Sequence, residues 1–121
     1  MKKVETITTR GASAVQEYRI AKKLGGKLSA NSGAGLWDKS DVSVQVADMN
    51  IECKTCVKPK ASFSIKKEWL EKNKQAGFIN RLHNHVIAFN FFYEDKDDYY
   101  IIDDKLMKFL VEKLIEENEN F

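Results

Sequence analysis

The 121 residues suit a single domain over residues 1–121, and the 43% hydrophobic, 31% charged composition excludes an intrinsically disordered chain. The formal net charge is +2, and two cysteines are too few for a disulfide scaffold. No apolar stretch approaches the ~20 residues that span a bilayer, and no apolar signal core follows Lys2 and Lys3. We therefore expect a soluble, cytoplasmic protein without a membrane partner.

Hydrophobic periodicity and turn residues divide the chain into helices and strands. In chain order we expect helix 11–24, strands 27–30, 42–46 and 51–57, helix 65–76, strands 85–93 and 99–102, and helix 105–117. The first helix has Ala14, Tyr18 and Ala21 at helical spacing and ends at Gly25-Gly26.

The alternating valines Val42, Val44 and Val46 predict a half-buried strand that opens at Asp41. A turn at 47–50 then makes the next strand antiparallel to it.

The second predicted helix has Ser64 as its N-cap and Gly77 as its stop, with Ile65, Trp69 and Lys72 along one face. The apolar stretch 85–93 predicts a strand buried on both faces. The closing helix carries a stripe of Leu106, Phe109, Leu110, Lys113 and Leu114. This order predicts an α/β fold, a mixed sheet flanked by helices.

The most informative pattern is Asp41, ten intervening residues, and then Glu52-Cys53-Lys54. Side chains alternate along a strand, so Glu52 and Lys54 share a face, and the hairpin can bring Asp41 beside Glu52. Two adjacent carboxylates repel unless a cation lies between them, and hard oxygen ligands favour Mg²⁺ or Mn²⁺. With a nearby lysine, these groups supply the parts for metal-assisted phosphodiester hydrolysis. A solvated strand face would produce the same pattern.

Charge is distributed unevenly along the chain. Residues 1–93 contain sixteen Lys and Arg against eight Asp and Glu, whereas residues 94–121 contain four Lys against ten Asp and Glu. A basic body suits a polyanion such as DNA, although an ordinary solvated surface explains it equally well. The lysines that follow the motif are the candidate DNA-binding residues: Lys58, Lys60, Lys66, Lys67, Lys72 and Lys74.

Four segments together resemble the PD-(D/E)xK nuclease superfamily, most closely its small archaeal-type Holliday-junction resolvases and related phage nucleases. The resemblance covers roughly residues 8–92. The matching segments are 11–17, which ends at Glu17, the serine-glycine loop 30–33, Ser40-Asp41-Val42, and Ile51-Glu52-Cys53-Lys54. Ser40 stands where the family has proline, and the acidic C-terminal third looks more phage-like than archaeal.

The resemblance implies a restriction-endonuclease-like fold and a Mg²⁺- or Mn²⁺-dependent endonuclease. Glu17, Asp41, Glu52 and the Cys53 carbonyl would bind the metal, and Lys54 would position water. Ser32 and Gln75 would support phosphate or water. A four-way DNA junction is the expected substrate, and a homodimer is the expected assembly because two sites could cut paired strands.

Other interpretations stay open at this point. The nuclease could act on linear or nicked DNA, or the chain could be a catalytically silent DNA-binding module. Cys53 and Cys56 could form half of a zinc site with His83 and His85, as in a zinc-stabilised adaptor. Residues three apart on a strand converge poorly, however, and this favours Cys53 as a small core residue.

Overall fold

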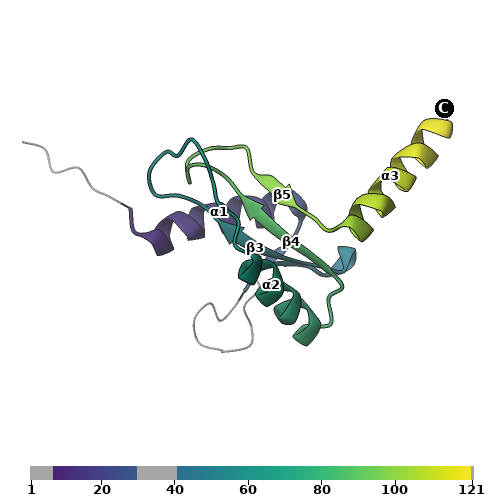
Figure 1. The fold of residues 1–121 in the computed structure, drawn as a ribbon, viewed down its shortest axis with the longest axis horizontal. Helices are drawn as coiled ribbons and strands as arrows, with labels where there is room; N and C mark the ends of the chain where they lie inside the picture. The colour runs from purple at the N-terminus through teal and green to yellow at the C-terminus, as the bar shows by residue number, and fades with distance from the viewer. Residues whose placement is uncertain (1–6, 30–40, 121) are drawn as a thin grey trace, which may run out of the picture.

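The protein forms a five-stranded mixed sheet with three α-helices, seen in a computed structural model that describes residues 7–29 and 41–120 (Figure 1). The strands lie in chain order, β1 to β5; β3 and β4 are parallel, and the other neighbours are antiparallel. The elements are α1 (Thr9–Leu24), β1 (Lys27–Leu28), β2 (Val42–Val44), the 3₁₀ turn η1 (Gln45–Ala47), β3 (Met49–Lys54), α2 (Lys67–Ile79), β4 (Asn84–Phe89), β5 (Tyr99–Ile101) and α3 (Asp104–Glu119). The predicted mixed α/β sheet with flanking helices is confirmed.

Helix α1 lies where the sequence predicts it, but with a different buried face. Its start is capped by the Thr8 hydroxyl, which accepts a hydrogen bond from the Gly11 N–H, and it ends at Gly25 in the left-handed conformation. Ala14 and Tyr18 are exposed. The buried positions are Ala12, Gln16, Ile20 and Ala21. The polar Gln16 belongs to the buried face, and apolar periodicity could not identify it.

The main core lies between α1 and the sheet. It consists of Ile20, Ala21, Val42, Val44, Ile51, Cys53, Val86, Ala88 and Leu106. The predicted β2–β3 hairpin and the core position of Cys53 are confirmed. The strand alternation ends at Val44, because η1 turns the chain and leaves Val46 98% exposed.

Helix α2 covers the other face of the sheet, and its limits differ from the prediction. It starts at Lys67 without a side-chain cap, so Ser64 is not the N-cap. Gly77 lies inside the helix instead of ending it. A Cβ on Gly77 would lie 2.1 Å from His85 Nδ1, so the glycine permits a close approach of α2 to β4.

The predicted face of Ile65 and Lys72 is exposed. The buried residues are Asn73, Ala76 and Gly77.

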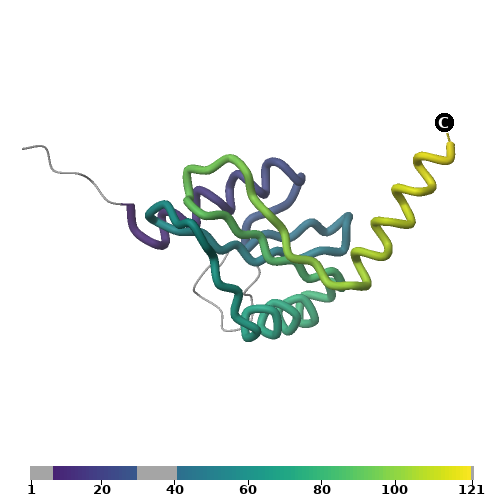
Figure 2. The backbone as a smooth tube through the Cα atoms, turned by 45° about the horizontal axis from the view of Figure 1, so that its top comes forward, coloured from purple at the N-terminus to yellow at the C-terminus, as the bar shows by residue number. Residues whose placement is uncertain are grey.

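Strand β4 is buried at Val86, Ile87 and Ala88, as predicted, but it ends at Phe89 rather than at residue 93. Helix α3 is capped by Asp103, whose carboxylate accepts a hydrogen bond from the Leu106 N–H at 2.8 Å. Only Leu106 of α3 is buried, and the helix projects away from the sheet (Figures 1 and 2). Across residues 7–29 and 41–120, no helix combines the length and apolar character needed to cross a membrane.

Candidate active site

The hairpin places two of the predicted carboxylates at one end of the sheet. Val42 pairs with Ile51, so Asp41 enters β2 beside Glu52 of β3. Asp41 Oδ2 accepts a hydrogen bond from the Cys53 N–H at 2.7 Å. This bond fixes Asp41 against the strand that carries Glu52 and Lys54.

Glu17 joins the same cluster from α1. Burial, followed by the charge of Asp41, raises the pKa of Glu17 to about 7. Burial also raises the pKa of Asp41 to about 6; the Cys53 N–H opposes this rise, and Glu52 adds to it. Asp41 therefore lies within electrostatic reach of Glu17 on one side and of Glu52 on the other.

Lys54 lies between the carboxylates and an aromatic ring. Its Nζ is 3.3 Å from Glu52 Oε1 and 4.4 Å from the centroid of the Trp69 ring. The two charged side chains are only 27% and 21% exposed, so their attraction is less screened than that of a surface pair. Trp69 packs on Phe63, which in turn contacts Phe89. The aromatic cluster thus holds the Lys54 ammonium near the carboxylates by a cation–π contact.

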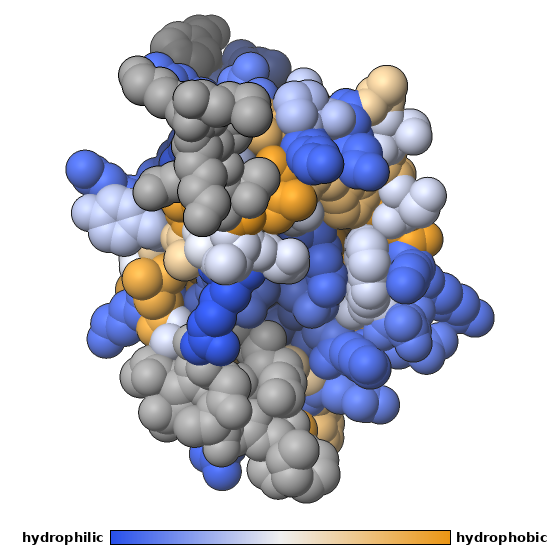
Figure 3. All heavy atoms as spheres, turned by 90° about the vertical axis from the view of Figure 1, so that its left-hand side faces the viewer, coloured by the Kyte–Doolittle hydropathy of each residue, from blue (hydrophilic) through white to orange (hydrophobic). Residues whose placement is uncertain are grey.

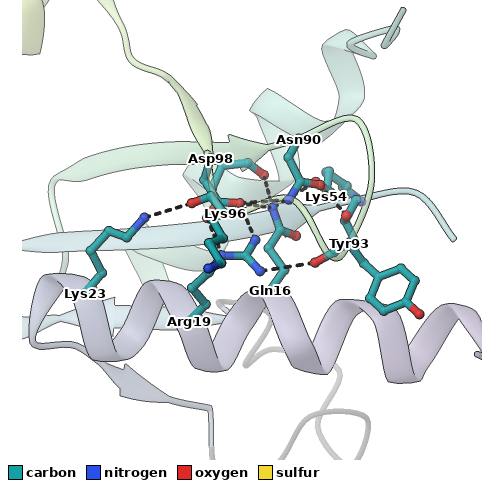
Figure 4. Close-up of polar contacts among 10 residues, drawn as sticks. Gln16, Arg19, Lys23, Lys54, Asn90, Tyr93, Lys96 and Asp98 are labelled. Atoms are coloured by element: carbon teal, nitrogen blue, oxygen red, sulfur yellow. Dashed lines mark hydrogen bonds and ion pairs between the residues drawn. The ribbon is translucent and has the colours of Figure 1, made fainter. Parts of the chain in front are cut away.

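A buried polar network anchors α1 to the ends of β3 and β4 (Figure 4). Arg19 forms a bidentate ion pair with Asp98, with Nε to Oδ2 at 2.9 Å and Nη2 to Oδ1 at 2.8 Å. The Asp98 side chain is fully buried and also accepts hydrogen bonds from Gln16 and Asn90. Gln16 donates a further bond to the Lys54 carbonyl oxygen at 3.0 Å.

This network sets the position of α1, and therefore of Glu17, relative to the motif strand. Gln16 precedes Glu17 on the helix, and its amide contacts the backbone of Lys54. Sequence reasoning missed these residues because Asp98 looked like one of several acids in a turn, and Gln16 like a polar surface residue. Neither has a spacing signal that distinguishes it from its neighbours.

The carboxylates of Glu17, Asp41 and Glu52 are of the chemical type that binds Mg²⁺ or Mn²⁺, but they are not close enough together to form a metal site as they stand. No group of three or more His, Cys, Asp or Glu that could hold a metal ion is found among residues 7–29 and 41–120. The available side-chain donors are nevertheless hard carboxylate oxygens, which suit these ions. Burial and mutual repulsion penalise the anionic forms of Glu17 and Asp41, and a divalent cation would relieve this penalty.

The two remaining predicted site residues are Ser32 and Gln75. Ser32 lies outside the described residues. Gln75 is exposed on α2 and lines a shallow hollow with Glu71, Lys74, Phe78 and Ile79. It is on the side of α2 opposite the sheet-facing Asn73, so the structure does not bring Gln75 to the carboxylates.

The six candidate DNA-binding lysines, defined above, are all exposed. Lys58 and Lys60 follow β3 directly, and Lys66 and Lys67 stand at the start of α2. Lys67 makes only a weak surface contact with Glu71, with the two charged atoms 4.0 Å apart. Figure 3 shows the left-hand side of the view in Figure 1, where hydrophilic residues cover much of the described surface.

The histidines and cysteines have separate surroundings. His83 Nδ1 contacts Asp48 Oδ2 at 2.8 Å, and His85 Nδ1 contacts Asn50 Oδ1 at 2.6 Å. Cys53 is in the core and Cys56 is half-buried, and both are free thiols. The structure therefore gives each histidine a polar partner other than a cysteine.

Comparisons with protein-family models, with curated proteins and with solved structures find no match to this chain. The resemblance to PD-(D/E)xK nucleases stays a prediction that rests on the sequence motifs.

Proposed function

We propose that this protein is a metal-dependent DNA endonuclease with a PD-(D/E)xK site and a restriction-endonuclease-like fold. The observation that carries the proposal is that Asp41, before β2, lies near both Glu17 of α1 and Glu52 of β3, and that Glu52 is paired with Lys54. A chance Asp-x10-Glu-x-Lys pattern on a solvated strand does not require a glutamate from a distant helix to approach it. The cluster is also shielded enough to raise two carboxyl pKa values.

In this proposal, Glu17, Asp41, Glu52 and the Cys53 carbonyl hold Mg²⁺ or Mn²⁺. Such an ion, once bound, would supply Lewis-acid stabilisation of phosphate charge and would lower the pKa of a water molecule. Lys54 orients the attacking water or a phosphate oxygen with its ammonium group. Trp69 and Glu52 limit the positions that the ammonium can adopt.

The DNA backbone would reach this site across the exposed lysines that follow β3 and open α2. Phosphate contacts from lysines give affinity without base identity. Such binding matches a nuclease that recognises the shape of its substrate, and a four-way junction is the substrate that the resemblance favours.

The direct test is cleavage of labelled four-way junction, linear duplex and single-stranded DNA in the presence of Mg²⁺ or of EDTA. We expect Mg²⁺-dependent cutting by the unmodified protein, with the junction cut in preference to the other two. Asp41→Asn and Glu52→Gln should each lower the cleavage rate by a factor of about 100 or more while binding is kept, because they remove charge from the metal site rather than from the lysines.

The matched control is Asp95→Asn, since Asp95 is an exposed carboxylate between β4 and β5 that lies outside the cluster. It should cleave at the unmodified rate. Cleavage by both site variants within a few-fold of the unmodified rate would refute the assignment of this site. DNA binding without cleavage under every metal condition would instead favour a catalytically silent module. Preferential cutting of linear or nicked duplex would keep the nuclease and replace the junction as its substrate.

A further inference from the structure

Helix α3 presents a large apolar face with no cover from the described part of its own chain. The helix leads away from the sheet after Leu106 (Figures 1 and 2). Its remaining apolar side chains are exposed by 40% or more: Met107, Phe109, Leu110, Val111, Leu114 and Ile115. This concentration on one short helix exceeds the scattered exposure that is normal on a monomer.

Most of these side chains fall on one side of the helix. At about 100° per residue, one half of the circumference carries apolar residues centred near Met107 and Leu114. We define the α3 face by its exposed residues Met107, Leu110, Val111, Leu114 and Ile115. Phe109 points about 140° away from Leu114, and the Lys113 ammonium lies 5.5 Å from the centroid of its ring.

A 16-residue helix with one buried residue gains little from tertiary packing, and isolated helices of this length are marginal in water. Burial of an amphipathic face is the usual source of the missing stability. The α3 face therefore fits a helical partner that offers a matching apolar stripe.

The charges of α3 indicate which partner fits. Its first half, residues 104–111, carries Asp104, Lys105 and Lys108, a net charge of +1. Its second half, residues 112–119, carries one lysine and four glutamates, a net charge of −3. Two parallel copies would place the acidic halves together, whereas two antiparallel copies place each acidic half against a basic one.

We propose that the α3 face binds the same face of a second copy of this chain, with the two helices antiparallel about a two-fold axis. This isologous contact buries both apolar stripes and closes on itself. The axis passes between Leu110 and Val111, and Met107 of one copy lies opposite Leu114 of the other. The proposal goes beyond the nuclease assignment and does not depend on it.

The first test is the oligomeric state of the full chain by sedimentation velocity over a range of concentrations. We expect a monomer–dimer equilibrium that Leu114→Glu weakens by about tenfold or more, because it places two charges in the apolar seam. Phe109→Glu is the matched control: it replaces a 52% exposed apolar residue on the same helix but off the α3 face, and should leave the equilibrium unchanged.

Since α3 lies outside the core beyond Leu106, both variants should match the melting temperature of the unmodified protein at concentrations where it is monomeric. This comparison separates loss of the dimer from loss of the fold. A monomer at every concentration, or a dimer that Leu114→Glu leaves intact, would overturn the proposal.

The second test determines helix direction with a short thiol-reactive crosslinker in a Cys56→Ser background. Met107→Cys and Leu114→Cys proteins should each crosslink poorly alone but form a covalent dimer when mixed. Efficient crosslinking of each single variant with itself would indicate parallel helices and contradict the antiparallel pairing.

Discussion

Glu17 and Asp41 ionise less readily in the folded protein than in the unfolded chain. Their pKa values rise to about 7 and about 6, chiefly because burial disfavours the charged forms. An acid with a raised folded-state pKa stabilises the fold below its unfolded pKa, and that contribution is lost as pH rises through the folded pKa. The cluster should therefore weaken the fold progressively between about pH 4 and pH 7, and this penalty should persist at higher pH.

Removing one of these charges should reverse the penalty. In EDTA, we expect Asp41→Asn to melt close to the unmodified protein at pH 4, and about 3 °C or more above it at pH 8. The asparagine oxygen can still accept the Cys53 N–H bond, so the main change is the loss of charge. Thermal melts at several pH values measure the difference.

Asp95→Asn is the control for this pH series, because Asp95 is an exposed acid whose removal should shift the melt little at either pH. Mg²⁺ at pH 8 should raise the melting temperature of the unmodified protein and have less effect on Asp41→Asn. If the difference in melting temperature between Asp41→Asn and the unmodified protein does not grow with pH, this would argue against repulsion between the carboxylates. If Mg²⁺ does not change the melting temperature of the unmodified protein, this would argue against a shared metal site.

At the scale of the elements, α1 is attached to the sheet by a polar network as well as by its apolar face. Asp98 accepts hydrogen bonds from Arg19, Gln16 and Asn90 with its side chain fully buried. Removing one partner of such a buried pair leaves the other charge without compensation, which costs more than the pair itself contributes.

We therefore expect Asp98→Asn to lower the free energy of unfolding by about 3 kcal/mol, as measured by denaturant titration. The matched control is Asp97→Asn, because Asp97 is the neighbouring acid in the same segment and is exposed. Its effect should stay within about 0.5 kcal/mol. Equal effects of the two substitutions would mean that the Arg19 ion pair does not anchor α1.

Local sequence rules predict some of the helices and strands correctly and others not. Cap and period signals place α1, and valine alternation places the β2–β3 hairpin, because these elements follow from residues near in sequence. The same rules misplace the ends of α2. A glycine often ends a helix, but Gly77 lies inside α2, where its missing side chain lets the helix approach His85 closely. That approach depends on tertiary packing.

The candidate site was similarly predictable only in part. Asp41, Glu52 and Lys54 share a hairpin, so strand alternation is enough to bring them together. The approach of Glu17 was expected only from the family resemblance, since its position depends on how α1 packs. Gln75 shows the limit of that reasoning: the resemblance suggests a role, but the rotation of α2 is set by Asn73, Ala76 and Gly77, which face the sheet.

At the scale of the whole molecule, the acidic and basic residues lie in different places, and this favours one direction of approach for a polyanion. The acidic C-terminal region includes most of α3, which projects from the sheet, while the candidate lysines follow β3 and line α2 (Figure 1). A DNA backbone drawn to the lysines would come near Lys54 without crossing the second half of α3. Electrostatic attraction over such a surface weakens as salt screens it.

This arrangement predicts separate effects for two pairs of lysines. Replacing Lys66 and Lys67 together by serine should weaken binding to duplex DNA about equally across sequences, since phosphates carry no base identity. Each lost phosphate contact should reduce the slope of log affinity against log salt by about 0.9. The control pair is Lys22 and Lys27, which line a shallow hollow beside α1 and β1 and should leave the slope unchanged. Binding titrations at several salt concentrations compare the two variants. If the control pair changes the slope and the α2 pair does not, the DNA path runs along α1 and β1, and the lysines after β3 are ordinary solvated surface.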